Sequence, residues 1–363
     1  MSYDFIPAAK PIIGDDERAA VDAVLATGML AQGTQVAEFE KEFSDVLLDG
    51  RSSVAVNSGT SGLHLGLLAS GVGPGDEVIV PSFTFAATGN SVALTGATPV
   101  FADIELDQYT LDVDHVASLI TDKTKGIMPV HLYGHPFNVE GFSKLAAERG
   151  IDLYEDAAQA HGASFNGQMV GTFGKFAMFS LYPTKNMTSG EGGMVSTSDA
   201  TVERNLRLLR NQGMEKQYEN EIVGFNARMT DLHASIGRVQ LKKVMGWTAQ
   251  RQQNAAFLTE NLEVVGTPKV AEGASHVYHQ YTIRVSEDRD GLAKALREEF
   301  NIGTGVYYPV PNHRLPSFNR TEELPNTETA AKEVLSLPVH PSLSQADLER
   351  IVTAVNKLAK AGA

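Results

Sequence analysis

Short apolar runs alternate with helical patterns from about residue 50 to residue 200, and this alternation limits the fold more than any other feature. Strands are expected at residues 53–56, 77–81, 98–104, 126–132 and 151–154, with helices between them at 63–70, 86–94, 112–120 and 139–149. Apolar strands that alternate with helices are typical of a mostly parallel sheet covered on both faces. The sequence therefore predicts an α/β fold with a mostly parallel central sheet flanked by helices.

Further elements are expected on both sides of this core. Helical patterns cover residues 15–26 and 34–48 before it, and residues 202–210, 230–244 and 248–262 after it. A second unit then shows a strand pattern at 279–285 and helical patterns at 290–300 and 345–358. We expect a large domain over residues 1–246, with N-terminal helices, and a smaller α/β C-terminal domain over residues 247–363.

Composition excludes several classes of protein. The formal net charge is −14, so the chain lacks the positive field that attracts nucleic acid or an anionic membrane. No apolar run approaches the roughly 18 residues of a membrane span, and the first residues do not read as a signal peptide. The absence of cysteine removes disulfides, thiolate catalysis and cysteine metal sites. We expect a cytoplasmic chain without nucleic-acid, membrane or metal partners.

Three segments carry chemistry, and the first is Asn57–Gly62. It joins an apolar strand to an apolar helix with small and hydroxyl residues. Free backbone N–H groups at a helix N-terminus form a seat for phosphate. A plain N-cap formed by a serine or threonine is the alternative for this segment.

The second and third segments supply a carboxylate and an amine. Asp156 ends a buried strand, where ligands collect in open α/β sheets, although an aspartate there also caps helices. Lys185 lies between a proline turn and the glycine run at 190–193, and a single lysine is usually a solvated surface residue. Its position downstream of Asp156 and the phosphate seat favours a functional role instead.

Together the three segments predict a site for pyridoxal 5′-phosphate. The cofactor's aldehyde forms a Schiff base with a lysine amine, here Lys185. Its pyridine nitrogen needs an anionic partner, here Asp156, so that the ring acts as an electron sink. Its phosphate needs N–H and hydroxyl donors, which residues 58–60 supply and to which Ser180 adds a hydroxyl.

At this point the chain resembles a known family almost from end to end. It is similar to the sugar aminotransferases of the DegT/StrS type, which are fold-type-I, aspartate aminotransferase-like enzymes that use pyridoxal phosphate. The motifs that carry the resemblance are the Ser58–Thr60 turn and residues 73–81, 129–134, 155–159, 182–186 and 224–229.

The resemblance implies a role for individual residues. The expected catalytic residues are Lys185, Asp156 and His161, with Lys185 also moving the proton. The expected cofactor contacts are Ser58, Gly59, Thr60, Phe85, Asp156, Gln159, Ser180, Lys185 and Asn226. Among these, Gln159 would touch the ring hydroxyl, while Phe85 either stacks on the ring or is a core aromatic. Asn226 would reach the neighbouring subunit's cofactor, which implies a homodimer with shared active sites.

The substrate side is also implied by the resemblance. The expected substrate contacts are His131, Tyr133, Arg228, Tyr308 and His313. A histidine in such a segment is either a structural hydrogen-bonding group or a group that acts on the substrate. Arg228 either holds the nucleotide diphosphate or forms an ion pair on the surface.

The implied activity is transfer of the amino group of glutamate to a nucleoside-diphosphate keto-sugar. Glu191 favours amination at C4 over C3, because relatives that act at C3 often carry aspartate there. Two alternatives are a sugar dehydratase that uses pyridoxal phosphate and a non-catalytic regulator that binds it. Related dehydratases replace the lysine by histidine, so Lys185 favours transamination. The presence of both Lys185 and Asp156 argues against a regulator that only binds the cofactor.

Overall fold

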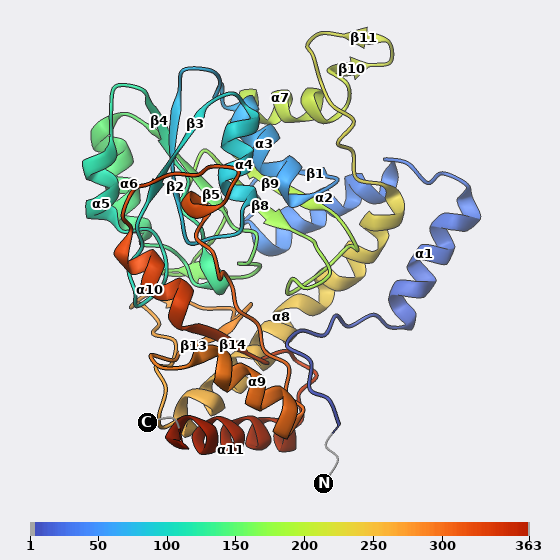
Figure 1. Ribbon diagram of the computed structural model, residues 1–363. Coiled ribbons are helices and arrows are strands. Elements are labelled where there is room, and N and C mark those ends of the chain that lie inside the picture. Colours follow the sequence, from blue (N-terminus) through green and yellow to red (C-terminus); the bar gives the residue numbers. More distant parts are fainter. Residues whose placement is uncertain (1–3, 362–363) are drawn as a thin grey trace.

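A seven-stranded sheet with the strand order β1-β9-β8-β5-β4-β2-β3 forms the centre of the molecule (Figure 1). The structure, a computed structural model, describes residues 4–361. The strands are β1 (Ser53–Val56), β2 (Glu77–Pro81), β3 (Thr98–Ala102), β4 (Thr124–Ile127), β5 (Asp152–Asp156), β8 (Phe176–Ser180) and β9 (Gly193–Thr197). β9 is antiparallel to its neighbours β1 and β8, and the other pairings are parallel. The predicted mostly parallel sheet is confirmed.

Helices cover both faces of this sheet because successive strand residues point to opposite sides. In β2, for example, Val78 and Val80 enter one core and Ile79 enters another. The first face is covered by α3 (Gly59–Ala69), α4 (Ala87–Leu94) and α7 (Ala200–Arg210). The second face is covered by α2 (Thr34–Leu47), α5 (Val113–Leu119), α6 (Val139–Arg149) and the start of α8 (Asp231–Asn261).

α8 is one continuous helix of 31 residues, where the sequence pattern predicted two. Its buried positions Val244 and Thr248 are four residues apart, so the buried stripe continues across Gly246. A glycine inside a helix costs about 1 kcal/mol, which packing on both sides offsets. Within residues 4–361, no helix, α8 included, has the combination of length and apolar character needed to cross a lipid bilayer.

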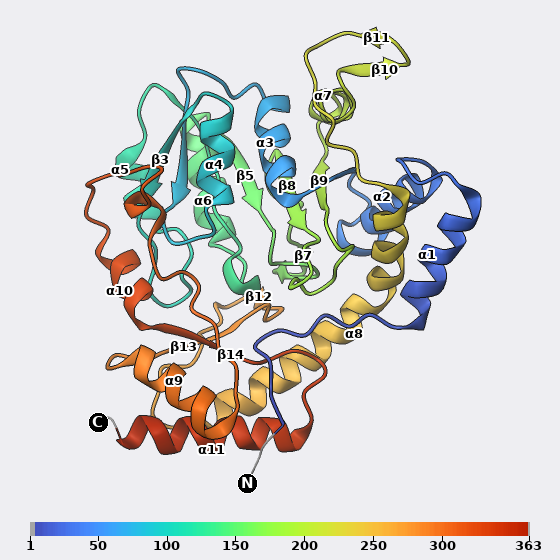
Figure 2. The same ribbon diagram turned by 45° about the vertical axis from the view of Figure 1, so that its right-hand side comes forward.

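The C-terminal part lies below the sheet and has its own core (Figure 1, Figure 2). β13 (Tyr281–Arg284) pairs with β14 (Val334–Leu337), and α9 (Arg289–Phe300), α10 (Pro325–Glu333) and α11 (Gln345–Ala361) accompany them. α8 runs from the sheet into this part and contributes Val244 to one core and Leu258 to the other. The proposed domain division at 246/247 therefore falls inside α8.

The remaining helix and strands lie around this body. α1 (Asp15–Thr27) packs against α8. A three-stranded sheet is formed by β6 (Ser164–Phe165), β7 (Gln168–Met169) and β12 (Ala274–Ser275). The hairpin of β10 (Met214–Lys216) and β11 (Glu219–Asn220) projects from the body near α7 (Figure 1).

Candidate active site

A cavity of about 580 Å³ lies beyond the carboxyl ends of β1, β5 and β8. Ten residues predicted for the site line it, namely Ser58, Gly59, Thr60, Phe85, Tyr133, Asp156, Gln159, Ser180, Lys185 and Tyr308. On the opposite side the C-terminal part closes it with His279, Gln280 and Tyr307. The cavity is therefore built where an open α/β sheet collects its ligands.

Lys185 carries the amine of this cavity. It sits in the loop after β8, and its backbone N–H donates to the carbonyl oxygen of Tyr182 at 3.0 Å. The Lys185 side chain lines the cavity and is half-buried by the surrounding protein. This burial lowers the pKa of the amine to about 8, while Asp156 opposes the shift. Near neutral pH, more of this amine is therefore unprotonated, and so able to act as a nucleophile, than in an ordinary lysine.

Asp156 is the last residue of β5 and only 4% exposed. Thr88 Oγ1, from α4, donates to its Oδ2 at 2.8 Å, and the backbone N–H of Ala158 donates to its Oδ1 at 3.1 Å. Burial raises the pKa of the carboxyl group, although these hydrogen bonds and Lys185 act in the opposite direction. A cation bound in the cavity would stabilise the charged form further.

The N-terminus of α3 provides donors for an anion. Ser58 is the N-cap residue, and its hydroxyl accepts from the backbone N–H of Ser61 at 3.1 Å. A Cβ at Gly59 would lie 3.1 Å from the Cβ of Ser180, and one at Gly193 would lie 2.8 Å from the Ser58 carbonyl oxygen. These two glycines let the helix start lie directly against β8 and β9, with its free N–H groups beside the Ser180 hydroxyl.

Three side chains join the strand ends to the C-terminal part. The backbone N–H of Tyr133 donates to Gln159 Oε1 at 2.7 Å, and Gln159 Nε2 donates to the hydroxyl of Tyr308 at 3.1 Å. The hydroxyl of Tyr133 donates to the carbonyl oxygen of Tyr307. These hydrogen bonds tie one wall of the cavity, which we call the Tyr133–Gln159–Tyr308 wall, to the C-terminal part.

Two of the predicted histidines lie away from the cavity lining. His131 is fully buried, with Nε2 3.0 Å from Glu155 Oε2, and its ring stacks on Phe137. His161 packs against Phe43 and Phe179, and among residues 4–361 neither of its ring nitrogens has a hydrogen-bond partner that meets the usual geometry. Burial, reinforced by Lys185, lowers the pKa of His161 to about 3, so this ring is neutral.

Three further predicted residues also lie outside the lining. His313 is buried beside Ser82, with its Nδ1 2.6 Å from the serine hydroxyl. Arg228 donates to Asn211 Oδ1 at 2.9 Å. Asn226 is exposed. These side chains do not reach the cavity of their own chain.

Sequence reasoning missed several polar residues of the site, and Thr88 and His279 are two of them. Thr88 supports Asp156 from a helix with no distinctive pattern of its own, so nothing local marked it. His279 lines the cavity. It stands at the start of the alternating strand pattern at 279–285, and this imidazole was the feature of the sequence that could have indicated a site residue.

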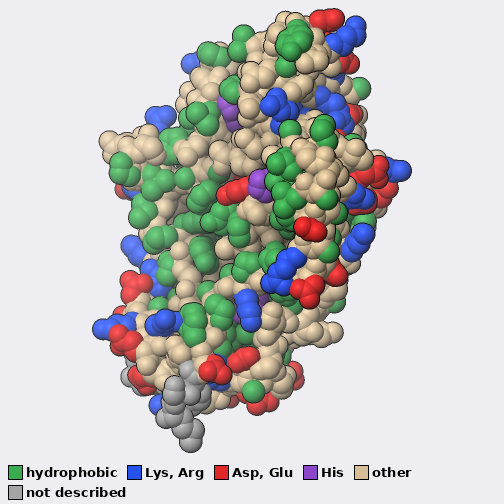
Figure 3. Space-filling view, turned by 90° about the vertical axis from the view of Figure 1, so that its right-hand side faces the viewer, with side chains coloured by type: hydrophobic (Ala, Val, Ile, Leu, Met, Phe, Trp, Pro, Cys, Tyr) green, Lys and Arg blue, Asp and Glu red, His purple; other side chains and the backbone are tan. Residues whose placement is uncertain are grey.

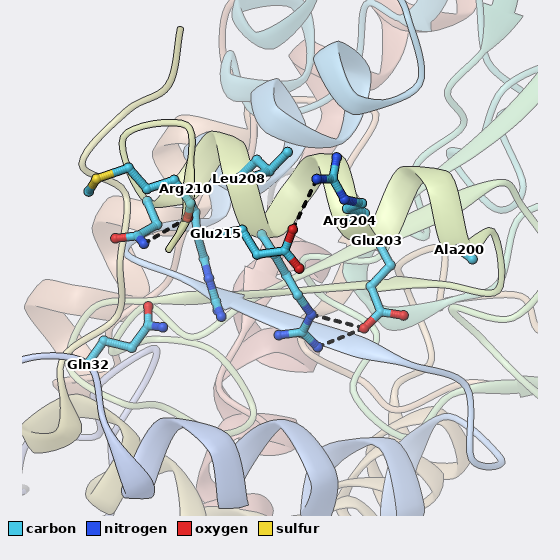
Figure 4. A pocket seen from close by; sticks show the side chains of 10 residues that line it. Gln32, Ala200, Glu203, Arg204, Leu208, Arg210 and Glu215 are labelled. Atoms are coloured by element: carbon cyan, nitrogen blue, oxygen red, sulfur yellow. Dashed lines mark hydrogen bonds and ion pairs between the residues drawn. The ribbon is translucent and has the colours of Figure 1, made fainter. Parts of the chain in front are cut away.

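A second hollow of about 370 Å³ lies between α7 and the segment that follows it (Figure 4). Its arginines are already paired: Arg204 with Glu215 at 3.0 Å, and Arg207 with Glu203 at 2.8 Å. Acidic partners therefore neutralise these cations, and the hollow lacks the free amine and anion seat of the cavity around Lys185.

The donor set of the main cavity fits pyridoxal 5′-phosphate. The cavity combines a buried amine of lowered pKa, a buried carboxylate and a helix N-terminus with hydroxyl groups. An aldehyde, a pyridine nitrogen and a phosphate require these three groups respectively. Fold and site together define a protein of the pyridoxal phosphate-dependent class.

The chain belongs to the DegT/DnrJ/EryC1/StrS aminotransferase family, whose model matches residues 11–356. A UDP-N-acetyl-3-dehydro-alpha-D-glucosamine 3-aminotransferase of Acidithiobacillus ferrooxidans is 41% identical, over 84% of this chain and 83% of its own. A protein of Geobacillus stearothermophilus named pleiotropic regulatory protein is 39% identical, over 92% and 91%.

Solved structures show the same fold. DesV of S. venezuelae, in complex with a ketimine intermediate, has a TM-score of 0.92 and 37% identity, over 98% of this chain and 99% of that one. Spr1654 of Streptococcus pneumoniae, a protein assigned as a sugar aminotransferase and solved in its PMP form, has a TM-score of 0.94 and 26% identity, over 99% of this chain and 98% of that one. The chain is an aminotransferase with pyridoxal 5′-phosphate as its cofactor.

Cofactor uptake should depend on pH through Lys185. Only the unprotonated amine is a nucleophile, and the pKa of Lys185 is about 8 instead of the usual 10.5. We therefore expect the rate at which the cofactor-free chain takes up pyridoxal phosphate to rise with pH, with its midpoint near 8. Stopped-flow absorbance over a pH series measures this rate, and a midpoint close to that of free lysine would contradict the expectation.

Proposed function

We propose that the chain transfers the amino group of glutamate to the keto group of a nucleotide-linked deoxysugar. The observation that carries the proposal is the cavity in which Lys185 and Asp156 lie beside the N-terminus of α3. The named relative that aminates a UDP-linked keto-sugar supports the acceptor class. Glutamate as donor is our proposal from the family resemblance.

Each group has a separate task in this proposal. The cofactor, when bound, supplies an electron sink for the carbon that carries the amine. The Lys185 amine removes the proton from this donor carbon and later returns a proton to the acceptor carbon, which is general acid–base catalysis. The Asp156 carboxylate holds positive charge at the cofactor's ring nitrogen. The N–H groups of α3 and the Ser180 hydroxyl bind phosphate, and the Tyr133–Gln159–Tyr308 wall limits water.

We propose C4 as the acceptor carbon, because relatives that act at C3 often carry aspartate where this chain carries Glu191, and Glu191 lines the cavity. The 3-aminotransferase among the relatives makes C3 the competing position. A panel of nucleotide-linked 3-keto and 4-keto sugars, each with and without glutamate, tests both points by mass spectrometry. We expect gain of an amine with the 4-keto sugars only when glutamate is present. Amination of 3-keto sugars alone would refute C4, and loss of water without glutamate would indicate a dehydratase.

A regulatory role is the second candidate, favoured by the name of the Geobacillus relative. A pure binding protein has no use for an amine of lowered pKa beside a buried carboxylate. Glutamate added alone to the purified protein separates the candidates. An aminotransferase changes the visible absorbance of its cofactor and releases 2-oxoglutarate, whereas a binding protein does neither.

We further propose a homodimer with shared active sites, in which Asn226 reaches the partner's cofactor phosphate. Asn226 is exposed in the single chain, as this role requires. Nearby apolar side chains are also exposed, including Tyr218 at 86% and Val223 at 90%. Apolar side chains gather across the middle of one face of the molecule (Figure 3). Large exposed apolar patches are typical of protein interfaces.

Mixed dimers test this sharing. Lys185→Ala and Asn226→Ala chains, each weak alone, are denatured together, refolded and assayed. If sites are shared, a mixed dimer has one site with both defects and one intact site, so activity returns above that of either parent. Refolding each variant alone is the control. Absence of recovery in dimers verified by mass spectrometry would refute shared sites.

A further inference from the structure

His279 lines the cavity that contains Lys185 and is held by the residue that follows this lysine. It lies just before β13 and is 6% exposed. Its Nδ1 is 3.3 Å from Oδ1 of Asn186. Within residues 4–361, no group forms a hydrogen bond with its Nε2.

Asn186 determines which ring nitrogen carries the hydrogen. Its Nδ2 donates to the carbonyl oxygen of Val277 at 3.1 Å, and because a carbonyl oxygen only accepts, this contact fixes the orientation of the amide. Its Oδ1 therefore faces His279 and can only accept, so Nδ1 of the imidazole must be the donor. In a neutral ring, Nε2 is then left with a free lone pair.

The surroundings of His279 keep the ring neutral. Burial lowers its pKa well below the usual value, and the cations Lys185 and Arg251 lower it further. The other titratable neighbours that affect it are His161 and His276, and none of these four groups is an acid. The ring thus presents an acceptor, and no positive charge, to the cavity.

We propose that Nε2 of His279 accepts a hydrogen bond from a hydroxyl group of the keto-sugar and so positions that substrate at Lys185. The inference rests on the proposed function. Of the two substrates, glutamate commits its amine to the cofactor, and its remaining polar groups are carboxylates, which only accept hydrogen bonds, whereas the sugar presents O–H donors away from its reacting carbon. A fixed acceptor therefore distinguishes the sugar from the amino donor.

The two half-reactions, measured separately in single turnovers, test the proposal. The sugar half-reaction can be run in reverse, with the amino sugar giving its amine to the cofactor. This half-reaction requires the contact between His279 and the sugar hydroxyl, whereas the glutamate half-reaction does not. Removing one neutral hydrogen bond by His279→Phe should lower kcat/KM for the sugar about tenfold and leave the glutamate half-reaction within about twofold. His279→Gln restores an acceptor and should recover most of the loss. His276→Phe, at a buried histidine outside the cavity lining, is the matched control.

An equal loss in both half-reactions, or in neither, would overturn the proposal, as would an equal loss in His276→Phe. NMR of the 15N-histidine-labelled wild-type enzyme adds a readout independent of activity. The resonance that disappears in His279→Gln should show a protonated Nδ1 and an unprotonated Nε2 from pH 6 to 8 (about the range in which free histidine titrates). The opposite tautomer, or a charged ring, would contradict the assignment. If the wild-type enzyme aminates no keto-sugar at all, the proposed function fails instead.

Discussion

Replacing Lys185 by alanine should lower the rate of the glutamate half-reaction by at least about 10⁴-fold, the upper range that a positioned acid–base group supplies. The substitution removes the amine that takes the proton and also the covalent attachment point for the cofactor. Rapid-mixing absorbance with glutamate measures the rate. We expect this loss because Lys185 is the lysine among the described residues that line the cavity.

Lys175→Ala is the matched control for this experiment. Lys175 is also a lysine close to β5, but its amine pairs with Asp152 at 2.9 Å and lies outside the cavity lining. Its removal should leave the half-reaction within about twofold, since a surface ion pair contributes little. A full rate in Lys185→Ala, with or without a loss in the control, would mean that another group performs the proton transfer.

Replacing Asp156 by asparagine should lower turnover by about 10²–10³-fold, as expected for loss of a preorganised charge. Asparagine keeps the size of the side chain, so the contact with Thr88 can persist while the negative charge is lost. Bound cofactor should remain detectable by absorbance, because the α3 N-terminus and Lys185 still hold it. Steady-state assays with glutamate and the best keto-sugar measure the loss.

Asp152→Asn, on the same strand, controls for the effect of the substitution itself. Asp152 begins β5, is partly exposed and pairs with Lys175, away from the cavity. We expect turnover close to wild type for this variant. Unchanged turnover in Asp156→Asn would remove the proposed role of the carboxylate, even if the protein lost some stability.

Much of the sheet could be predicted from local patterns, and the deviations have physical causes. β1 and β2 begin and end where the apolar runs indicate. The run at 126–132 is longer than β4, which ends at Ile127. Beyond β4, Val130 forms only a single parallel bridge, with Asp156 of β5, and Val130 and Leu132 pack in a core shared with Ala330 and Val334 of the C-terminal part. β9 begins at Gly193, the last residue of the glycine run, and the turn signals of this run hid the strand, which was not predicted.

The candidate site was predictable where it depends on strand ends. Asp156 and Ser180 end parallel strands and Ser58 follows another, so the topology brings them to one edge of the sheet. The roles of the histidines depended on distant partners. His131 faces Glu155, 24 residues away, and His279 faces Asn186, 93 residues away. No local pattern separates these two cases.

Borohydride reduction of the holoenzyme, followed by peptide mapping, tests the central claim most directly. Reduction makes the link between cofactor and protein permanent, and mass spectrometry then identifies the modified residue. Our account predicts a single modified peptide with the cofactor on Lys185. A label on any other residue, or no label in protein that contains the cofactor, would contradict it.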